Sequence, residues 1–165
     1  MLIATHKRLN VNPVIHLRYD ELIVVDIYQH NKKVLSVLTI YNPNFKELNK
    51  LKCLLSSLEI LIENKENFLL TGDFNLPNAF PYSLDKSTGK KYVMFYDFIA
   101  KIHPVTQCIN FQTRGLNILD LIFISDTSKL SNITCHPPIH RSDHNLMFGN
   151  YNIQKLISYN LSKNF

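Results

Sequence analysis

Runs of apolar residues predict a series of strands along the chain. A β-branched run over 21–28 and a second run over 33–41 are joined by a short polar turn, which is the pattern of a β-hairpin. Because both runs are almost continuously apolar, we expect the hairpin to lie inside a sheet that is covered on both faces. Further strands are expected at 2–4, 68–74, 107–111, 118–125, 132–136 and 145–153.

Two segments carry a helical pattern instead. Over 45–64, leucine and isoleucine recur at intervals of three and four residues, with lysine and glutamate mostly between them. We interpret this apolar stripe as core packing. A second helix is expected over 93–103, after a loop over 77–91 that contains proline, glycine and scattered polar residues. Strands that alternate with two helices predict a layered α/β domain with a mixed sheet.

Length and composition indicate one globular domain over residues 1–165, and 45% of the residues are hydrophobic. Eighteen basic and thirteen acidic residues give a net charge of +5, which favours polyanionic partners such as nucleic acid. The cysteines Cys53, Cys108 and Cys135 lie far apart, so we expect reduced thiols. No apolar run reaches the roughly 20 residues that a membrane span needs. The first residues do not resemble a signal peptide, and we expect an intracellular protein.

The first candidate for chemistry is the Gly-Asp-Phe-Asn stretch over 72–75, which ends an apolar strand. Asp73 stands where the chain leaves the core, and Gly72 would permit a ligand to approach closely. Asn75 would return to the same side of an extended chain, so the two side chains could position a water molecule and a phosphoryl oxygen. The alternative is that Asp73 and Asn75 only form a turn.

Three further positions add to this candidate site. Asp120 interrupts an apolar strand and therefore needs a partner, for which His144 is the favoured candidate and a backbone amide the alternative. Asp143 directly precedes His144, so the two side chains point in different directions. We expect Asp143 to bind a divalent cation. We expect His144 to contact a carboxylate and a phosphate. An inert surface pair is the alternative. Tyr41 ends its strand, where aromatic residues commonly only pack.

The order of these motifs resembles the endonuclease/exonuclease/phosphatase family, which has the DNase I-like fold. The stretches that carry the resemblance are 41–44, 68–77, 113–121 and 137–144, and it extends from about residue 2 to residue 151. The form is similar to the apurinic-type endonuclease domain of non-LTR retrotransposons of the jockey and CR1-like kind. The resemblance implies a DNase I-like layered α/β sandwich of mixed sheets with flanking helices.

The resemblance also implies a reaction, the metal-assisted hydrolysis of a DNA phosphodiester that nicks one strand. Asp73 would orient or deprotonate the attacking water, and Asn75 would lie beside it on the phosphate. His144, oriented by Asp120, would contact the scissile phosphate and help to stabilise the transition state. Tyr41 would donate a hydrogen bond to a phosphate oxygen.

The remaining implied roles concern the metal and the DNA. Asp143 would help to hold Mg²⁺ or Mn²⁺, and Thr113, Arg114 and Asn117 correspond to family positions near bound DNA. In a full-length element a reverse transcriptase would be fused to the domain. The resemblance further implies DNA as the partner, a monomer, and a nuclear location.

One departure from the family concerns the start of the chain. The family domain opens with a strand that carries an Asn, a helix, and a strand that ends in the Glu that is the main magnesium ligand. Glu21 matches a later strand, so we do not take it as that ligand and expect an N-terminally truncated domain. Three hypotheses follow: a nicking endonuclease, impaired or not by the loss of this Glu; an inactive remnant of the same fold; and a phosphatase of the same superfamily.

Overall fold

The computed structural model describes residues 3–14, 21–43, 47–77, 79–80, 89–102 and 104–153. Its elements in chain order are β1 (Asn10–Val14), β2 (Leu22–Gln29), β3 (Lys32–Tyr41), α1 (Leu48–Ile62), β4 (Phe68–Asp73), α2 (Lys90–Lys101), β5 (Thr106–Gln107), β6 (Asp120–Ile124), the 3-10 turn η1 (Thr127–Lys129), β7 (Leu130–His136) and β8 (Leu146–Tyr151). Within these ranges, no helix has the length and apolar character that crossing a membrane requires.

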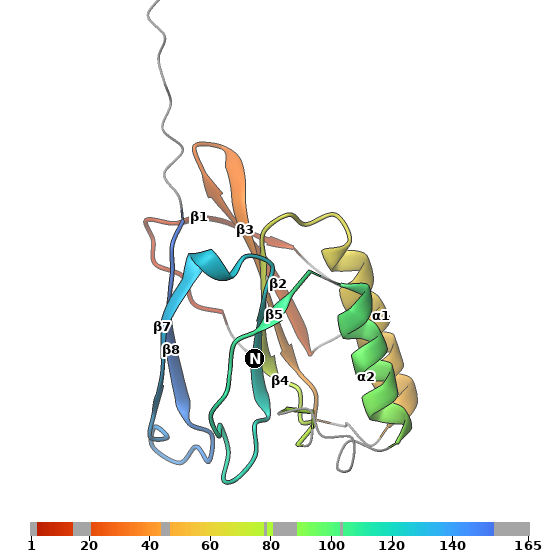
Figure 1. Cartoon of the computed structure of the whole chain (residues 1–165). Helices are drawn as coiled ribbons and strands as arrows, with labels where there is room; N and C mark the ends of the chain where they lie inside the picture. The colour runs from red at the N-terminus through yellow and green to blue at the C-terminus, as the bar shows by residue number, and fades with distance from the viewer. Residues whose placement is uncertain are drawn as a thin grey trace, which may run out of the picture.

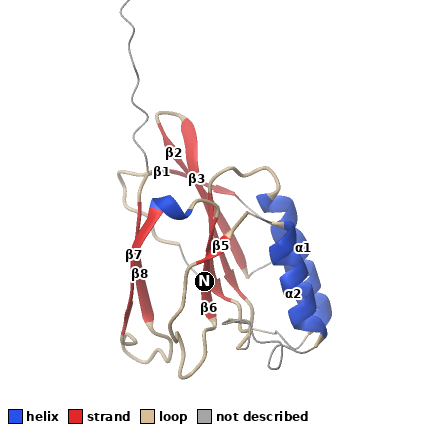
Figure 2. Ribbon diagram, viewed as in Figure 1, coloured by secondary structure: helices blue, strands red, loops and turns tan. Residues whose placement is uncertain are grey.

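The elements form three layers, with a six-stranded sheet between a helical layer and a small second sheet (Figure 1). The large sheet has the order β1-β2-β3-β4-β6-β5; its β3–β4 pair is parallel and its other pairs are antiparallel. Helices α1 and α2 lie side by side on one face, and the antiparallel β7–β8 pair lies on the other side (Figure 2). The predicted layered α/β architecture with a mixed sheet is confirmed.

The predicted β-hairpin is present as β2 and β3, which pair antiparallel. Its turn residues His30 and Asn31 have φ angles of 49° and 61°. Positive φ at both central residues matches the twist of a two-residue hairpin, and Asn tolerates this conformation well. Val24 and Val25 of β2 are both buried although their side chains point to opposite faces. Both faces of this strand are therefore covered, as the apolar run predicts.

The N-terminal strand differs from the expectation. Ile3 and Ala4 are not in a strand, and residue 2 lies outside the described residues. The first strand is β1, which the apolar pattern does not predict because it contains two asparagines and Pro13. This strand lies at the edge of the sheet, where the missing N–H of a proline is tolerated.

Several element boundaries also differ by a few residues. Helix α1 is described from Leu48, with residues 44–46 outside the described part, and α2 begins three residues earlier than predicted. Of the predicted loop over 77–91, residues 78 and 81–88 are not described, nor is residue 103 of the second predicted helix. The strand predicted over 107–111 shortens to the two residues of β5, because the Gln107 side chain bonds to both backbone groups of Ile109 and closes a local turn.

The core lies between the helices and the large sheet, and aromatic rings fill the part beneath the candidate site. Phe74 packs edge-on against Phe95 of α2 and Phe123 of β6, with ring centroids 5.6 Å apart in each pair. All three side chains are at most 2% exposed. Since Phe74 directly follows Asp73, this packing fixes the backbone from which the candidate site projects.

Gly72 permits the close parallel pairing of β3 and β4. Its φ angle is 138°, and a Cβ atom built on it would lie 1.9 Å from the carbonyl oxygen of Ile40. The close approach that we expected here from a ligand is therefore made by the neighbouring strand. Only glycine adopts this conformation readily and leaves the required space.

We expect Gly72→Ala to lower the free energy of unfolding by about 3 kcal/mol or more, because the new methyl group adds a backbone clash to an unfavourable φ. Gly89→Ala is a matched control, because Gly89 has a φ of 114° and no described atom within 4 Å of a built Cβ. Gly89 has a φ of 114° and a ψ of 157°, a region that is almost exclusive to glycine, so its loss should be limited to the conformational cost of about 1–3 kcal/mol. Urea unfolding measures both, and equal losses would contradict the proposed clash.

Candidate functional site

Strand register gathers three predicted residues at one edge of the sheet. Tyr41 and Asp73 are register partners across β3 and β4, and Asp73 and Asp120 are register partners across β4 and β6. Residues at the same level of adjacent strands project toward the same face of a sheet. Asp73 is 9% exposed, whereas Tyr41 is 46% exposed, so Tyr41 is the more solvent-accessible member of this row.

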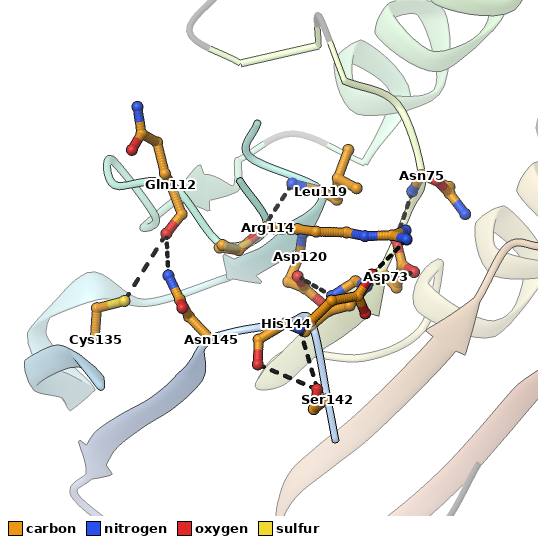
Figure 3. Close-up of polar contacts among 12 residues, drawn as sticks. Asp73, Asn75, Gln112, Arg114, Leu119, Asp120, Cys135, Ser142, His144 and Asn145 are labelled. Atoms are coloured by element: carbon orange, nitrogen blue, oxygen red, sulfur yellow. Dashed lines mark hydrogen bonds and ion pairs between the residues drawn. The ribbon is translucent and has the colours of Figure 1, made fainter. Parts of the chain in front are cut away.

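His144 completes this group from the loop between β7 and β8. Its Nδ1 lies 2.8 Å from Oδ2 of Asp120, and its Nε2 lies 3.8 Å from Oδ2 of Asp73 (Figure 3). Because carboxylate oxygens accept hydrogen bonds, the tautomer in which Nδ1–H donates to Asp120 satisfies this contact. The predicted contact between Asp120 and His144 is confirmed, and it turns Nε2 toward Asp73.

Asp73 occupies an unusual electrostatic position. Burial raises the pKa of its carboxyl above the ordinary value, and the neighbouring charge of Asp120 raises it further. The Asn75 amide, His144 and Arg114 lower the pKa of Asp73, but they do not cancel the rise. A carboxylate with a raised pKa accepts a proton more readily than an ordinary one, which suits a general base.

Thr113 is fully buried, at 0% exposure, and its hydroxyl faces the protein interior. Its Oγ1 accepts hydrogen bonds from the backbone N–H groups of Leu119 and Asp120, at 2.9 Å and 3.0 Å. This geometry gives Thr113 a positioning role at the start of β6, and its expected place near bound DNA stays a prediction. The threonine thus holds the backbone that carries the Asp120 carboxylate.

Asn145 is a positioning residue that the sequence analysis does not identify. Its backbone N–H donates to the carbonyl of Thr113 at 2.7 Å, and its side-chain amide donates to the carbonyl of Gln112 at 3.0 Å. These bonds tie the residue after His144 to the loop that leads into β6. Ser142 adds a bond from the His144 N–H to its hydroxyl, at 3.1 Å. The only sequence signal is an amide side chain next to a candidate catalytic histidine.

Asn42 is a second such residue. It is 5% exposed, and its side-chain amide donates to the carbonyl of Phe74 at 3.0 Å. Its backbone N–H donates to the carbonyl of Asp73 at 2.9 Å. Asn42 therefore ties the end of β3, which carries Tyr41, to the end of β4. An Asn-Pro pair after a strand is typical of a turn, but it carries no signal for this bond.

Asn75 corrects one local expectation. Its φ angle is 53°, which is left-handed rather than extended, so strand alternation does not place its side chain. Its backbone N–H donates to Oδ1 of Asp73 at 2.9 Å, which leaves the other carboxylate oxygen directed to His144. Asn75 still reaches the site, because it lines the adjacent cleft.

This cleft has a volume of about 500 Å³. It is lined by Asn75, Pro77, Arg114, Gly115, Asn117, Leu119 and Asp143. Two predicted DNA-contacting residues, Arg114 and Asn117, thus share one cavity with Asn75. Nη2 of Arg114 lies 2.6 Å from Oδ2 of Asp143, and both side chains are open to solvent. Adjacent residues Asp143 and His144 therefore turn to different partners, as expected.

Comparison with known proteins identifies the family. Residues 35–148, more than half of the chain, match the family model described as endonuclease-reverse transcriptase. The chain belongs to this family. No curated protein matches it by sequence.

Solved structures with a similar fold include nucleases and a phosphatase. One is the endonuclease domain of TRAS1, a telomere-specific non-LTR retrotransposon, with 16% identity and a TM-score of 0.72. The match covers 91% of the chain described here and 72% of the TRAS1 chain. Another is the 3′ phosphatase NExo from Neisseria, bound to a product DNA hairpin, with 15% identity and a TM-score of 0.59. That match covers 87% of the present chain and 70% of the NExo chain. A third is the AP endonuclease LMAP from Leishmania major, with 12% identity and a TM-score of 0.58. Here the match covers 80% of the present chain and 55% of the LMAP chain. These similarities establish the DNase I-like fold.

Nucleases of this superfamily generally depend on divalent metal ions. Among the residues that the structure describes, however, no three His, Cys, Asp or Glu side chains form a group that could hold one. Asp143, the expected ligand, pairs with Arg114, and the Asp120 carboxylate is engaged by His144. The described residues of this chain therefore do not by themselves form a binding site for Mg²⁺.

Because the pKa of Asp73 is raised in the folded state, folding favours its protonated form. This contribution to stability is complete below the ordinary value of 3.8 and is lost as pH rises through the raised value. Asp73→Asn imitates the protonated form, so we expect it to unfold at higher urea concentration than the wild type at pH 7. The difference should shrink toward pH 4.

Asp26→Asn is the matched control with the opposite sign. Burial alone would raise the pKa of Asp26, but the Ser36 hydroxyl, Lys65 and Lys33 lower it below the ordinary value. Loss of this charge should destabilise the chain at pH 7 by about 1–3 kcal/mol. If both variants were destabilised at pH 7, the ionised Asp73 would be stabilising, contrary to the interpretation above.

Proposed function

We propose that this chain is a DNA endonuclease that hydrolyses a phosphodiester bond and nicks one strand. The observation that carries the proposal is the position of His144, whose two ring nitrogens face the carboxylates of Asp120 and Asp73. Membership of the endonuclease-reverse transcriptase family and the nuclease folds of similar structures support it. The net charge of +5 favours a polyanionic substrate.

Asp73 is the proposed base for the attacking water. Its Oδ1 is held by the Asn75 amide, so the carboxylate has a fixed orientation at the edge of the cleft. The water gives its proton to Asp73 as its oxygen bonds to phosphorus. The bond from phosphorus to the leaving oxygen breaks, and the leaving oxygen keeps the electron pair and takes a proton from solvent. The raised pKa of Asp73 favours this proton transfer.

His144 and Tyr41 are the proposed groups that stabilise the phosphate. Asp120 holds the imidazole through Nδ1, so a protonated His144 presents Nε2–H toward the side on which Asp73 lies. This N–H would donate to a phosphate oxygen as negative charge develops on it. The half-exposed Tyr41 hydroxyl would donate to a second oxygen from the next strand.

The remaining parts of the proposal concern cofactor and partners. We infer a requirement for Mg²⁺ or Mn²⁺ from the superfamily, and such a cation supplies charge neutralisation at a phosphate when it is bound. Arg114 and Asn117 are the proposed DNA contacts in the cleft. A fused reverse transcriptase, a monomeric domain and a nuclear location belong to the same hypothesis.

Plasmid nicking tests the activity. The purified chain with Mg²⁺ should convert supercoiled DNA to the open-circular form, and EDTA should stop the conversion. His144→Ala and Asp73→Ala/His144→Ala should each lower the rate by about 10²–10⁴-fold, because both lose the hydrogen bond from His144 to the phosphate and the double variant also loses the base. His136→Ala is a matched control, since His136 lies on β7 and its ring packs against Phe148.

Two results would overturn this proposal. A wild-type chain that is folded by circular dichroism but does not nick DNA would support the inactive remnant. Release of phosphate from a 3′-phosphorylated oligonucleotide without nicking would support a phosphatase, in line with the similarity to the Neisseria 3′ phosphatase fold.

Asp120→Asn tests the orienting role separately. An amide can accept from Nδ1 but cannot stabilise a charged imidazole, so kcat should fall by about 10³-fold. KM for an oligonucleotide duplex should change by less than about threefold, because Asp120 faces His144 rather than the cleft. A loss confined to KM would instead assign Asp120 to substrate binding.

A further inference from the structure

Arg114 is presented by a tight turn with a well-defined backbone. The N–H groups of Thr113 and Arg114 donate to the carbonyl of Asn117, and the Asn117 N–H donates back to the carbonyl of Arg114. Gly115 provides the left-handed residue of this turn, with a φ of 55°. The backbone of the turn is therefore held by its own hydrogen bonds and does not depend on the Arg114 side chain.

The guanidinium extends from this turn toward the end of β4, where Asp73 and Asn75 lie (Figure 3). Its Nη2 contacts Oδ2 of Asp143 at 2.6 Å, a short charge-assisted hydrogen bond. Among the described residues, Asp143 is the carboxylate of the site that is most open to solvent, with 66% of its side chain exposed. Carboxylate oxygens of this kind are the ligands that Mg²⁺ and Mn²⁺ prefer.

We propose that Arg114 competes with divalent cations for Asp143. In the chain without DNA, the guanidinium of Arg114 takes the place beside Asp143 that a divalent cation would otherwise occupy. A cation that binds Asp143 must break the 2.6 Å contact and then lie beside the guanidinium. The first step forfeits an exposed ion pair, and the second places like charges close together.

Mn²⁺ binding to the full chain, measured by electron paramagnetic resonance without DNA, tests the competition. We expect Arg114→Gln and Arg114→Ala each to bind Mn²⁺ about tenfold more tightly than the wild type, because the rival charge is gone. Asp143→Asn and Arg114→Gln/Asp143→Asn should both lack this tighter binding. Equal affinity in the wild type and both Arg114 variants would overturn the proposal, as would a gain that survives Asp143→Asn.

Two features keep this test decisive. Arg114→Gln retains a polar side chain of similar length, so it provides a folded variant even where Arg114→Ala is destabilised; thermal unfolding monitors both. The measurement uses no DNA and no catalytic step, and therefore does not depend on the proposed function. A chain that fails to nick DNA can still show the competition at Asp143, and a nicking chain can still lack it.

Discussion

The site depends on one electrostatic constraint, which is that two carboxylates face each other across paired strands. Asp73 and Asp120 are register partners, and both are mostly removed from water. Their mutual repulsion would be unfavourable without a group of opposite polarity. His144 is that group, because it bonds to Asp120 and lies beside Asp73. The same arrangement that relieves the repulsion also directs Nε2 of His144 toward Asp73.

This constraint explains why so much of the surrounding structure serves to fix backbone. Gly72 lets β3 approach β4 closely, and Asn42 ties the ends of these strands together. Thr113 holds the start of β6, and Asn145 holds the loop that carries His144. Each contact acts on a backbone group rather than on a reacting side chain. A small misplacement of any one strand would separate the three groups that the proposed reaction needs.

Two kinds of signal in the sequence lead to correct predictions: the spacing of apolar residues, and the need of a carboxylate in apolar surroundings for a partner. The β2–β3 hairpin and helix α1 follow from periodicity, and the Asp120–His144 contact follows from the need of a carboxylate inside an apolar strand for a partner. The edge strand β1 and the backbone tie between Thr113 and Asn145 depend on contacts between different segments of the chain. The left-handed Asn75 depends on a bond to the Asp73 side chain that strand alternation does not predict. Residue type alone carries no signal for such contacts.

The adjacent residues Asp143 and His144 divide the site into two parts with different strengths. His144 points inward to largely buried carboxylates, where an interaction loses little to solvent and is costly to break. Asp143 points outward to Arg114 through an ion pair that water can replace, and exposed pairs of this kind contribute about 0–1 kcal/mol. The inner part can therefore hold a fixed geometry while the outer part exchanges partners. The proposed nicking of DNA would need this division, because it requires a fixed alignment of His144 with the carboxylates and an open side that admits a charged polymer.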